Sequence, residues 1–574
     1  MIRVRHVFTT AAFLCVVLLL AACDATVSQG SPHDMRTSKR KSSEHAQNTD
    51  RTQSAVRSQP RQQRAAPVTM AERSGGTAQD RTLTVMPSVQ PIRRPRPRLP
   101  VRMEREQYAE LDGNPVRRVA EHPVSTFSID VDTGSYTNVR RMLNAGQLPP
   151  KNAVRVEEFI NYFDYHYPVP DDAEQPFSMT TALAPTPWNA DTKLLRIGIQ
   201  GWLPPGDPPP ANLVFLIDVS GSMHGPQRLP LLKSALKLLV RQLDGDDRVS
   251  IVTYAGQSDL ALEPTPGDET AKILAVIDGL QAAGSTNGGD GIRRAYDMAR
   301  QAYIDDGINR VILATDGDFN VGTVDFDTLT ELVARRAEAG IALTTLGFGV
   351  GNYNEKLMEQ LAGRGDGNYA YIDSLSEAER VLVANRAATL HTIAKDVKIQ
   401  VEFNPAVVAE YRLIGYENRM LDRAEFNNDK VDAGDIGAGR NVTALYEIAL
   451  VGSGGSHMDP LRYQATDAEQ GKTDEAAFLR LRYKLPDEHD SRLIETPIAA
   501  AAMQSDPGDA DDSLRFAAAV AAFGQLLRGG TWTGDYDYDD VLALARTARG
   551  QDSDGRRGEF LQLVKLAAAL DTRE

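Results

Sequence analysis

The sequence has 574 residues and a formal net charge of −15. A hydrophobic fraction of 42% and a charged fraction of 25% are ordinary for globular protein, so the chain can bury sizeable cores and is long enough for roughly three or four domains. The acidic balance argues against nucleic acid as the main partner.

The N-terminus has the pattern of an export signal. Arg3 and Arg5 precede an apolar run at residues 7–20, which is too short to span a bilayer comfortably. The run ends in Leu-Ala-Ala-Cys, with the cysteine at position 23, and this resembles the bacterial lipobox. We therefore predict a lipoprotein signal peptide at residues 1–22 and acylation of Cys23, including palmitate. An ordinary signal peptide with a chance cysteine is the alternative.

A basic tether follows the signal peptide. Residues 24–105 hold 16 Lys and Arg against 7 Asp and Glu, and they are rich in Pro, Gln and Ser. Such a segment cannot bury enough apolar surface to offset its ordering entropy, so we predict a disordered tether at residues 23–120. Its charge could bind anionic headgroups or cell-wall polymers, or it is a solvated spacer.

The lipid anchor predicts a location in the bacterial envelope. Asp24 follows the acylated cysteine and resembles an inner-membrane retention signal, so the inner membrane facing the periplasm is favoured, with the outer membrane or cell surface as the alternative. Of the two cysteines, Cys15 would be removed with the signal. The mature chain would then have no disulfide, and its folding would depend on its cores.

The first ordered region is predicted at residues 121–205. Residues 124–131 alternate as a half-buried strand does, and residues 194–199 also read as a strand. Between them, residues 136–143 and 156–162 look helical. A proline-rich linker ends the region.

Residues 211–390 alternate strands and helices. The predicted strands are nearly all apolar, as parallel strands buried on both faces are. The helix predicted at residues 228–243 carries leucines and an alanine at amphipathic spacing. This order predicts an α/β domain with a Rossmann-like, doubly wound and mostly parallel sheet. The strands are predicted at 212–217, 248–254, 309–314, 341–347 and 369–373.

The pattern changes again over residues 392–574. Strands are predicted at 397–403, 444–451 and 478–483, and they indicate a β-sandwich-like region at residues 392–485. A helical region follows at residues 510–572, with helices predicted at 513–528, 538–549 and 557–570. As an alternative, strands before residue 205 and after residue 392 join in one sheet, and residues 211–390 are an insertion.

Oxygen-bearing side chains follow two of the predicted parallel strands and one loop. Ligand sites in such sheets lie at the carboxyl ends of strands. Hard divalent cations prefer oxygen ligands, and hydroxyls add no charge, so a metal held mainly by hydroxyls can still accept a carboxylate from another molecule. The candidate metal ligands are Asp218, Ser220, Ser222, Thr286 and Asp316.

This arrangement resembles the metal-ion-dependent adhesion site (MIDAS) of von Willebrand factor type A (VWA) domains. The resemblance implies that three hydroxyls bind the ion, that Asp218 and Asp316 bind it directly or through waters, and that one position stays open. It also implies Mg²⁺, with Mn²⁺ or Ca²⁺ as alternatives, and a protein ligand that donates an Asp or Glu. The competing interpretation is that Asp218 and Ser220 only cap the following helix.

The regions on either side of the VWA-like domain extend the resemblance. Residues 127–133, 157–163 and 411–418 look like the flanks of a bacterial VWA lipoprotein family with an N-terminal flank and a C-terminal domain of unknown function. The sequence has no His-Glu-x-x-His and no Gly-x-Ser-x-Gly motif, so we expect no enzyme. We predict a membrane-anchored protein that binds a protein partner through the metal. The alternative is a scaffold or assembly factor of an envelope complex, with the metal only stabilising the domain.

Overall fold

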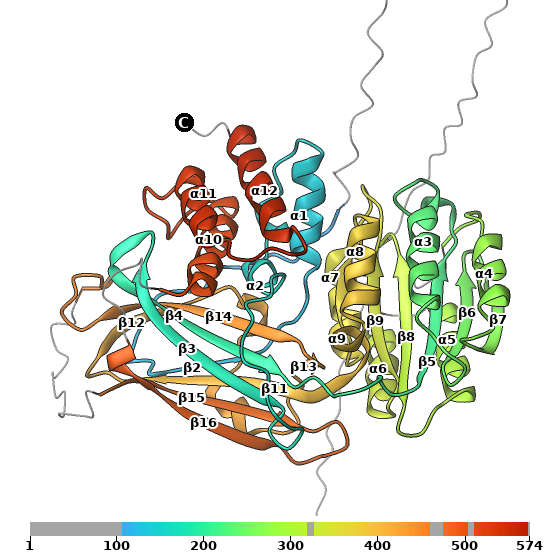
Figure 1. Ribbon diagram of the computed structural model, residues 1–574, viewed down its shortest axis with the longest axis horizontal. Coiled ribbons are helices and arrows are strands. Elements are labelled where there is room, and N and C mark those ends of the chain that lie inside the picture. Colours follow the sequence, from blue (N-terminus) through green and yellow to red (C-terminus); the bar gives the residue numbers. More distant parts are fainter. Residues whose placement is uncertain (1–105, 287, 318–325, 460–473, 503–509, 572–574) are drawn as a thin grey trace, which may run out of the picture. The chain divides into compact units, whose positions relative to one another are not determined.

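A computed structural model describes residues 106–286, 288–317, 326–459, 474–502 and 510–571 (Figure 1). The chain divides into two units, Met1–Pro95 and Arg96–Glu574, and every described residue belongs to the second. The predicted signal peptide, Cys23 and the tether up to residue 105 lie outside the described residues.

The predicted parallel sheet is confirmed. It has six strands in the order β10-β9-β8-β5-β6-β7, all parallel except β7, which runs antiparallel to β6 (Figure 1). Strand β7 was not among the predicted strands. The strands are β5 (Ala211–Asp218), β6 (Arg248–Tyr254), β7 (Ser258–Pro266), β8 (Ile308–Thr315), β9 (Ala342–Gly347) and β10 (Tyr369–Tyr371).

Two layers of helices cover this sheet. Phe215 of β5 belongs to the core that includes buried residues of α3 and α4, whereas Val214 and Leu216 belong to the core with α5, α6 and α7. This alternation buries the strand on both faces, as its apolar sequence requires. The helices are α3 (Leu229–Val240), α4 (Thr270–Gly279), α5 (Gly289–Gln301), α6 (Phe326–Glu338), α7 (Glu355–Arg364), α8 (Leu375–Glu379) and α9 (Arg386–Leu390), with the 3-10 turn η2 (Gly221–Met223) and the π-helical turn η3 (Arg380–Ala384).

Two antiparallel sheets form a sandwich beside this domain. One has the order β1-β12-β14-β4-β3, and the other joins β13, β11, β15 and β16, with β2 also paired to β11. Their inner faces share one core, in which Ile197 of the first sheet and Ile399 of the second are both buried. The strands are β1 (Arg117–Arg118), β2 (Val124–Ser128), β3 (Phe177–Thr186), β4 (Asn189–Gly201), β11 (Thr392–Phe403), β12 (Val408–Ile414), β13 (Gly434–Gly437), β14 (Asn441–Leu450), β15 (Glu475–Lys484) and β16 (Arg492–Ala499).

Strands from both sides of the α/β domain build this sandwich. Phe127 of β2 pairs with Ile399 of β11, and Ile197 of β4 pairs with Ala444 of β14. The predicted sandwich at residues 392–485 was therefore incomplete, because four of its strands precede the α/β domain. The alternative arrangement, with residues 211–390 inserted between β4 and β11, is the one observed.

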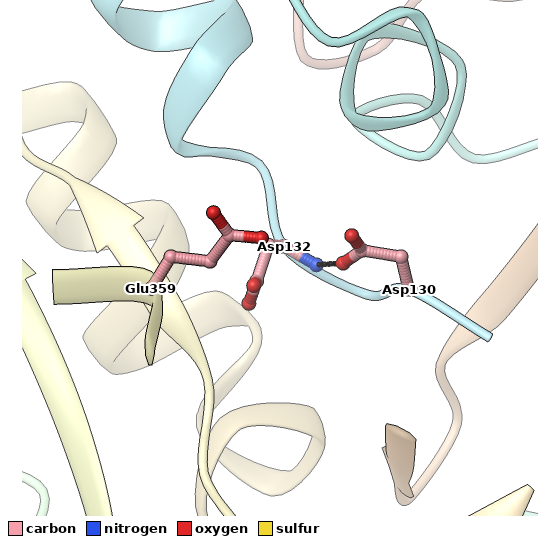
Figure 2. A group of neighbouring side chains, drawn as sticks. All are labelled: Asp130, Asp132 and Glu359. Atoms are coloured by element: carbon pink, nitrogen blue, oxygen red, sulfur yellow. Dashed lines mark hydrogen bonds between the residues drawn. The ribbon is translucent and has the colours of Figure 1, made fainter. Parts of the chain in front are cut away.

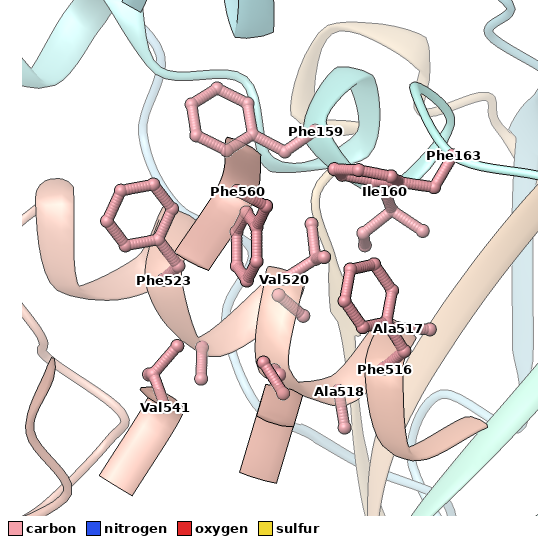
Figure 3. Close-up of a cluster of buried hydrophobic side chains, with 14 of the residues drawn as sticks. Phe159, Ile160, Phe163, Phe516, Ala517, Ala518, Val520, Phe523, Val541 and Phe560 are labelled. Carbon is pink, nitrogen blue, oxygen red and sulfur yellow. The ribbon is translucent and has the colours of Figure 1, made fainter. Parts of the chain in front are cut away.

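Helices from both flanks share a separate core (Figure 3). Phe163 packs edge-on against Phe516 with ring centroids 5.1 Å apart, and Phe523 packs against Phe560 at 5.4 Å. Leu194 and Leu445 of the first sandwich sheet join the same core. The helices are α1 (Gly134–Asn144), α2 (Val156–Ile160), α10 (Asp512–Leu527), α11 (Tyr538–Thr547) and α12 (Arg556–Leu570), with 3-10 turns η1 (Lys151–Ala153), η4 (Glu417–Arg419), η5 (Arg423–Asn427) and η6 (Ala500–Ala502).

The predicted tether boundary at residue 120 is wrong. Gln107 donates its backbone N–H to the carbonyl of Tyr353 at 2.8 Å, and Arg117 of β1 pairs with Tyr411 of β12. These backbone pairings hold residues 106–120 in the folded unit. The sequence did not indicate these pairings, because the segment is polar and a two-residue strand is too short to show an alternating pattern.

Candidate metal centre

The loop after β5 places two hydroxyls side by side. Asp218 is wholly buried at the end of the strand, and its Oδ1 accepts the backbone N–H of Ser220 at 2.8 Å. This turn brings the Oγ atoms of Ser220 and Ser222 to 2.8 Å from each other. Three of the five predicted ligands thus lie together, as the Asp-x-Ser-x-Ser spacing indicated.

The neighbouring strand adds the second carboxylate. Strand β8 runs parallel to β5 with Ala314 beside Ile217, so Thr315 and Asp316 follow at the same edge of the sheet. The hydroxyl of Thr315 donates to Oδ2 of Asp218 at 3.0 Å, and Asp316 is wholly buried next to it. Thr315 was not among the predicted site residues, although its position before Asp316 is a usable signal.

The loop that carries Thr286 packs against the serine loop. Gly221 donates its backbone N–H to the carbonyl of Gly284 at 3.0 Å, and Ala283 donates to the carbonyl of Val219 at 2.7 Å. These bonds hold half-buried Thr286 two residues from the contact. The loop that carries Thr286 therefore lies against the serine loop. In the described part of the chain, the Thr286 side chain makes no hydrogen bond to the other four predicted ligands.

Burial shapes the charge of the site. It raises the pKa of Asp218 to about 6, the hydrogen bonds from Ser220 lower it, and the nearby Asp316 carboxylate raises it again. Two buried carboxylates beside three hydroxyl groups form an oxygen-only set that suits a hard divalent cation. A bound cation would favour the ionised form of both carboxylates.

Two further residues contact the site and were missed by sequence analysis. Asn352 donates from Nδ2 to Oδ2 of Asp316 at 3.2 Å, and the Arg228 guanidinium lies 3.4 Å from the same oxygen. Arg228 also donates to the carbonyl of Ser222 and, at 3.0 Å, to Oδ1 of Asn352. It thereby joins the serine loop to the loop after β9.

The loop after β9 requires a glycine next to this arginine. Gly349 has a φ of +78°, and a Cβ there would lie 2.3 Å from Nε of Arg228. A side chain would therefore be strained and would collide with the guanidinium. The glycine-rich run at residues 347–351 is the sequence signal that could have identified this support.

A second group of carboxylates lies away from the predicted ligands. Asp130, Asp132 and Glu359 have carboxylate oxygens within 4.8 Å of one another, and Figure 2 shows Asp130 accepting the backbone N–H of Asp132. The Arg419 guanidinium already contacts all three, at 2.9, 3.3 and 3.4 Å respectively. Burial, then the Asp130 carboxylate, raises the pKa of Asp132. This group is an ion-pair network between the sandwich and α7.

Arg155 extends the network. Its side chain is wholly buried and contacts Glu355 at 2.8 Å and Glu359 at 2.7 Å, both on α7, and Glu158 at 3.4 Å. Buried ion pairs of this kind fix geometry because breaking one leaves an uncompensated charge. The α/β domain is thus held to the flanking module by charged contacts.

Sequence comparisons agree with this architecture. The family model described as von Willebrand factor type A domain matches residues 212–383, one described as von Willebrand factor matches residues 102–196, and one described as Uncharacterized protein YfbK, C-terminal, matches residues 388–570. VWA domains mediate protein–protein interactions, some through a divalent metal.

Several known proteins are similar to this chain. Uncharacterized protein YfbK of Escherichia coli (strain K12) is 48% identical over 470 residues, which cover 80% of this chain and 81% of that protein. Inter-alpha-trypsin inhibitor heavy chain H3 of Homo sapiens is 26% identical over 259 residues, 42% of this chain and 29% of that protein. The solved structure of von Willebrand factor type A from Catenulispora acidiphila is 16% identical, covers 67% of this chain and 89% of that chain, and gives a TM-score of 0.38.

Proposed function

The chain belongs to the YfbK family of VWA-domain proteins, and we propose that it binds a protein partner through a divalent metal ion held at the edge of its parallel sheet. Mg²⁺ is the proposed ion, with Mn²⁺ or Ca²⁺ as alternatives. The proposed ligands are Asp218, Ser220, Ser222, Thr286 and Asp316.

The observation that carries this proposal is the pairing of two serine hydroxyls in the loop that follows the buried carboxylate of Asp218. The Oγ atoms of Ser220 and Ser222 lie 2.8 Å apart at the buried end of β5. Helix capping alone does not explain this, because the Ser220 side chain accepts no capping bond from η2. The hydroxyls are therefore available to a cation.

The partner would supply a carboxylate to the remaining position on the metal. The hydroxyl ligands add no negative charge of their own, so an Asp or Glu from another molecule can complete the coordination. The chain itself carries a net charge of −15, and a bound cation would create a local attractive point for an acidic side chain.

A capture experiment tests the proposal. The immobilised full chain is incubated with envelope extract in Mg²⁺ or in EDTA, and bound proteins are identified by mass spectrometry. We expect Asp218→Ala and EDTA to remove the same bound protein. Asp297→Ala, which changes an exposed aspartate on α5, should retain it. Capture that resists both EDTA and Asp218→Ala would refute the metal-dependent mode.

A scaffold function is the second candidate, and the buried network around Arg155 and Arg419 favours it. Arg155, next to α2, and Arg419, in η4, hold α7 to the flanking module, so the module can present one rigid surface. In that case the metal would raise the melting temperature of the chain, while partner capture would be unchanged in EDTA.

We further propose that a lipid on Cys23 anchors the protein to the bacterial inner membrane, facing the periplasm. The lipobox-like sequence and Asp24 support this. In the described part of the chain, no helix is long and apolar enough to cross a membrane. Radiolabelled palmitate should enter the wild type and Cys15→Ala but not Cys23→Ala. Equal labelling of the Cys23→Ala variant would refute the anchor.

Membrane fractionation tests which membrane holds the anchor. The wild type should band with the inner membrane, and Asp24→Ser should move protein to the outer membrane. Outer-membrane banding of the wild type would contradict the proposed location.

A further inference from the structure

A cavity of about 230 Å³ lies where the sandwich meets the C-terminal helices. Its walls come from β12, α10, η1 and residues 111–114, and it is separate from the predicted metal ligands. We infer that this cavity binds a singly charged carboxylate, either of a small acid or of a peptide C-terminus.

Gln525 of α10 supplies the first observation. Its side chain is only 8% exposed, and its Oε1 accepts a hydrogen bond from Nη2 of Arg412 at 2.9 Å. A guanidinium only donates, so this bond fixes the amide orientation and leaves Nε2 as the donor on the other side. Within the described residues Nε2 has no partner. A buried amide donor without an acceptor favours a ligand that brings one.

Lys151 of η1 supplies a cation at the same cavity. Its side chain makes no ion pair in the described part of the chain, and its Nζ lies beside Gly529, where a Cβ would approach to 2.5 Å. Gly529 has a φ of +113°, so this close approach is built into the turn that ends α10. The ammonium of this exposed lysine therefore lines the cavity.

The charges that line the cavity select a monoanion. Of the lining cations Lys151, Arg412 and Arg528, Arg412 is already paired with Glu447 at 2.8 Å. Arg528 is already paired with Glu417 at 2.5 Å. Lys151 is then the lining cation that makes no ion pair in the described part of the chain, so a monocarboxylate matches its single charge, whereas a phosphate dianion would add excess negative charge beside exposed Asp112.

The remaining wall suits an apolar group next to the carboxylate. Val156, Ile414 and Trp532 line the cavity, and the Arg412 guanidinium lies 5.1 Å from the centre of the Trp532 ring. Small-ligand sites combine apolar walls with few convergent polar groups in this way. A carboxylate attached to a hydrophobic body therefore fits better than acetate.

Ligand-observed NMR on the full chain tests this inference with benzoate, and with benzamide as the neutral isostere. Benzoate should saturate with a dissociation constant on the order of 1 mM, and benzamide should bind at least about tenfold more weakly. N-acetyl-Ala-Ala-Phe and its C-terminal amide test the peptide source. Tighter binding of the peptide acid than of benzoate would assign the site to a chain terminus, and the reverse order would assign it to a small acid.

Variants distinguish specific binding of benzoate in this cavity from nonspecific attraction of the anion to surface lysines. Lys151→Met should weaken benzoate binding about tenfold, and Gln525→Glu, which keeps the bond from Arg412 but adds a negative charge, should abolish it. Lys565→Met removes an exposed lysine of α12 and should have no effect. Equal affinity for benzoate and benzamide, or full benzoate binding by a folded Gln525→Glu variant, would overturn the inference.

Discussion

Replacing Arg155 by Met should strongly destabilise the chain. The arginine is wholly buried against Glu355, Glu359 and Glu158. Methionine fills similar volume but leaves Glu355 and Glu158 without their cation, while Glu359 keeps its contact with Arg419. Breaking a buried pair in this way costs about 3–5 kcal/mol of unfolding free energy. Arg335→Met removes an exposed pair with Glu331 on α6 and should cost less than about 0.5 kcal/mol.

The loss of unfolding free energy in Arg155→Met should increase as the pH rises. Burial already raises the pKa of Glu355 and Glu158, and loss of the guanidinium raises both further in the folded variant. The folded variant then holds more protons than the unfolded chain, whose glutamates titrate near 4.5. Its stability therefore falls as pH rises above that value. The deficit should be smallest near pH 5 and largest near pH 8.

Urea unfolding of both variants and the wild type, followed by circular dichroism at pH 5, 6.5 and 8, measures these differences. A loss below about 1 kcal/mol at pH 8 would refute the assignment of Arg155 as the buried counter-ion. A large loss that does not change with pH would refute the role of the carboxylates. In that case packing alone would explain the cost.

Two predictions concern the support and titration of the metal site. Gly349→Ala should displace Arg228, because the new Cβ would collide with the guanidinium, and Arg228 joins the serine loop to the loop after β9. We therefore expect the Mg²⁺ affinity measured by calorimetry to fall about tenfold. Gly452 is the control, because its φ is similar, at +79°, but a Cβ there would meet nothing within 4 Å. We expect Gly452→Ala to leave the metal affinity unchanged. An equal loss of affinity in both variants would show that a collision with Arg228 is not the cause. Because Asp218 has a pKa of about 6 without metal, apparent affinity should fall about tenfold per pH unit below 6 and level off above it. Affinity that is flat from pH 5 to 8 would count against Asp218 as a ligand.

The local sequence pattern was sufficient to predict most strands and helices of the α/β domain. Asp218 and Asp316 end apolar strands in the sequence, and parallel register alone brings such ends together. The alternation at residues 397–403 likewise identified β11. Sequence could not pair β2 with β11, because their contact at Phe127 and Ile399 depends on the fold of everything between them.

The ionic contacts that support α7 and the metal site could not be predicted from the sequence, for the same reason. Arg155 reads as one polar residue near a short helix, and its partner Glu355 lies 200 positions later. Arg228 and Asn352 also meet only when the loops after β5 and β9 converge on Asp316. A hydrophobic period predicts which face is buried, but it carries no information about distant ionic partners.

Titration of Mg²⁺ and Mn²⁺ into the purified full chain at pH 7.5, by calorimetry, tests whether Asp218 helps to hold a divalent ion. Wild type and the exposed-residue control Asp297→Ala should each bind one ion, and Asp218→Ala should bind none while its circular dichroism is unchanged. Absence of saturable binding in the wild type, or equal affinity in a folded Asp218→Ala variant, would contradict the account.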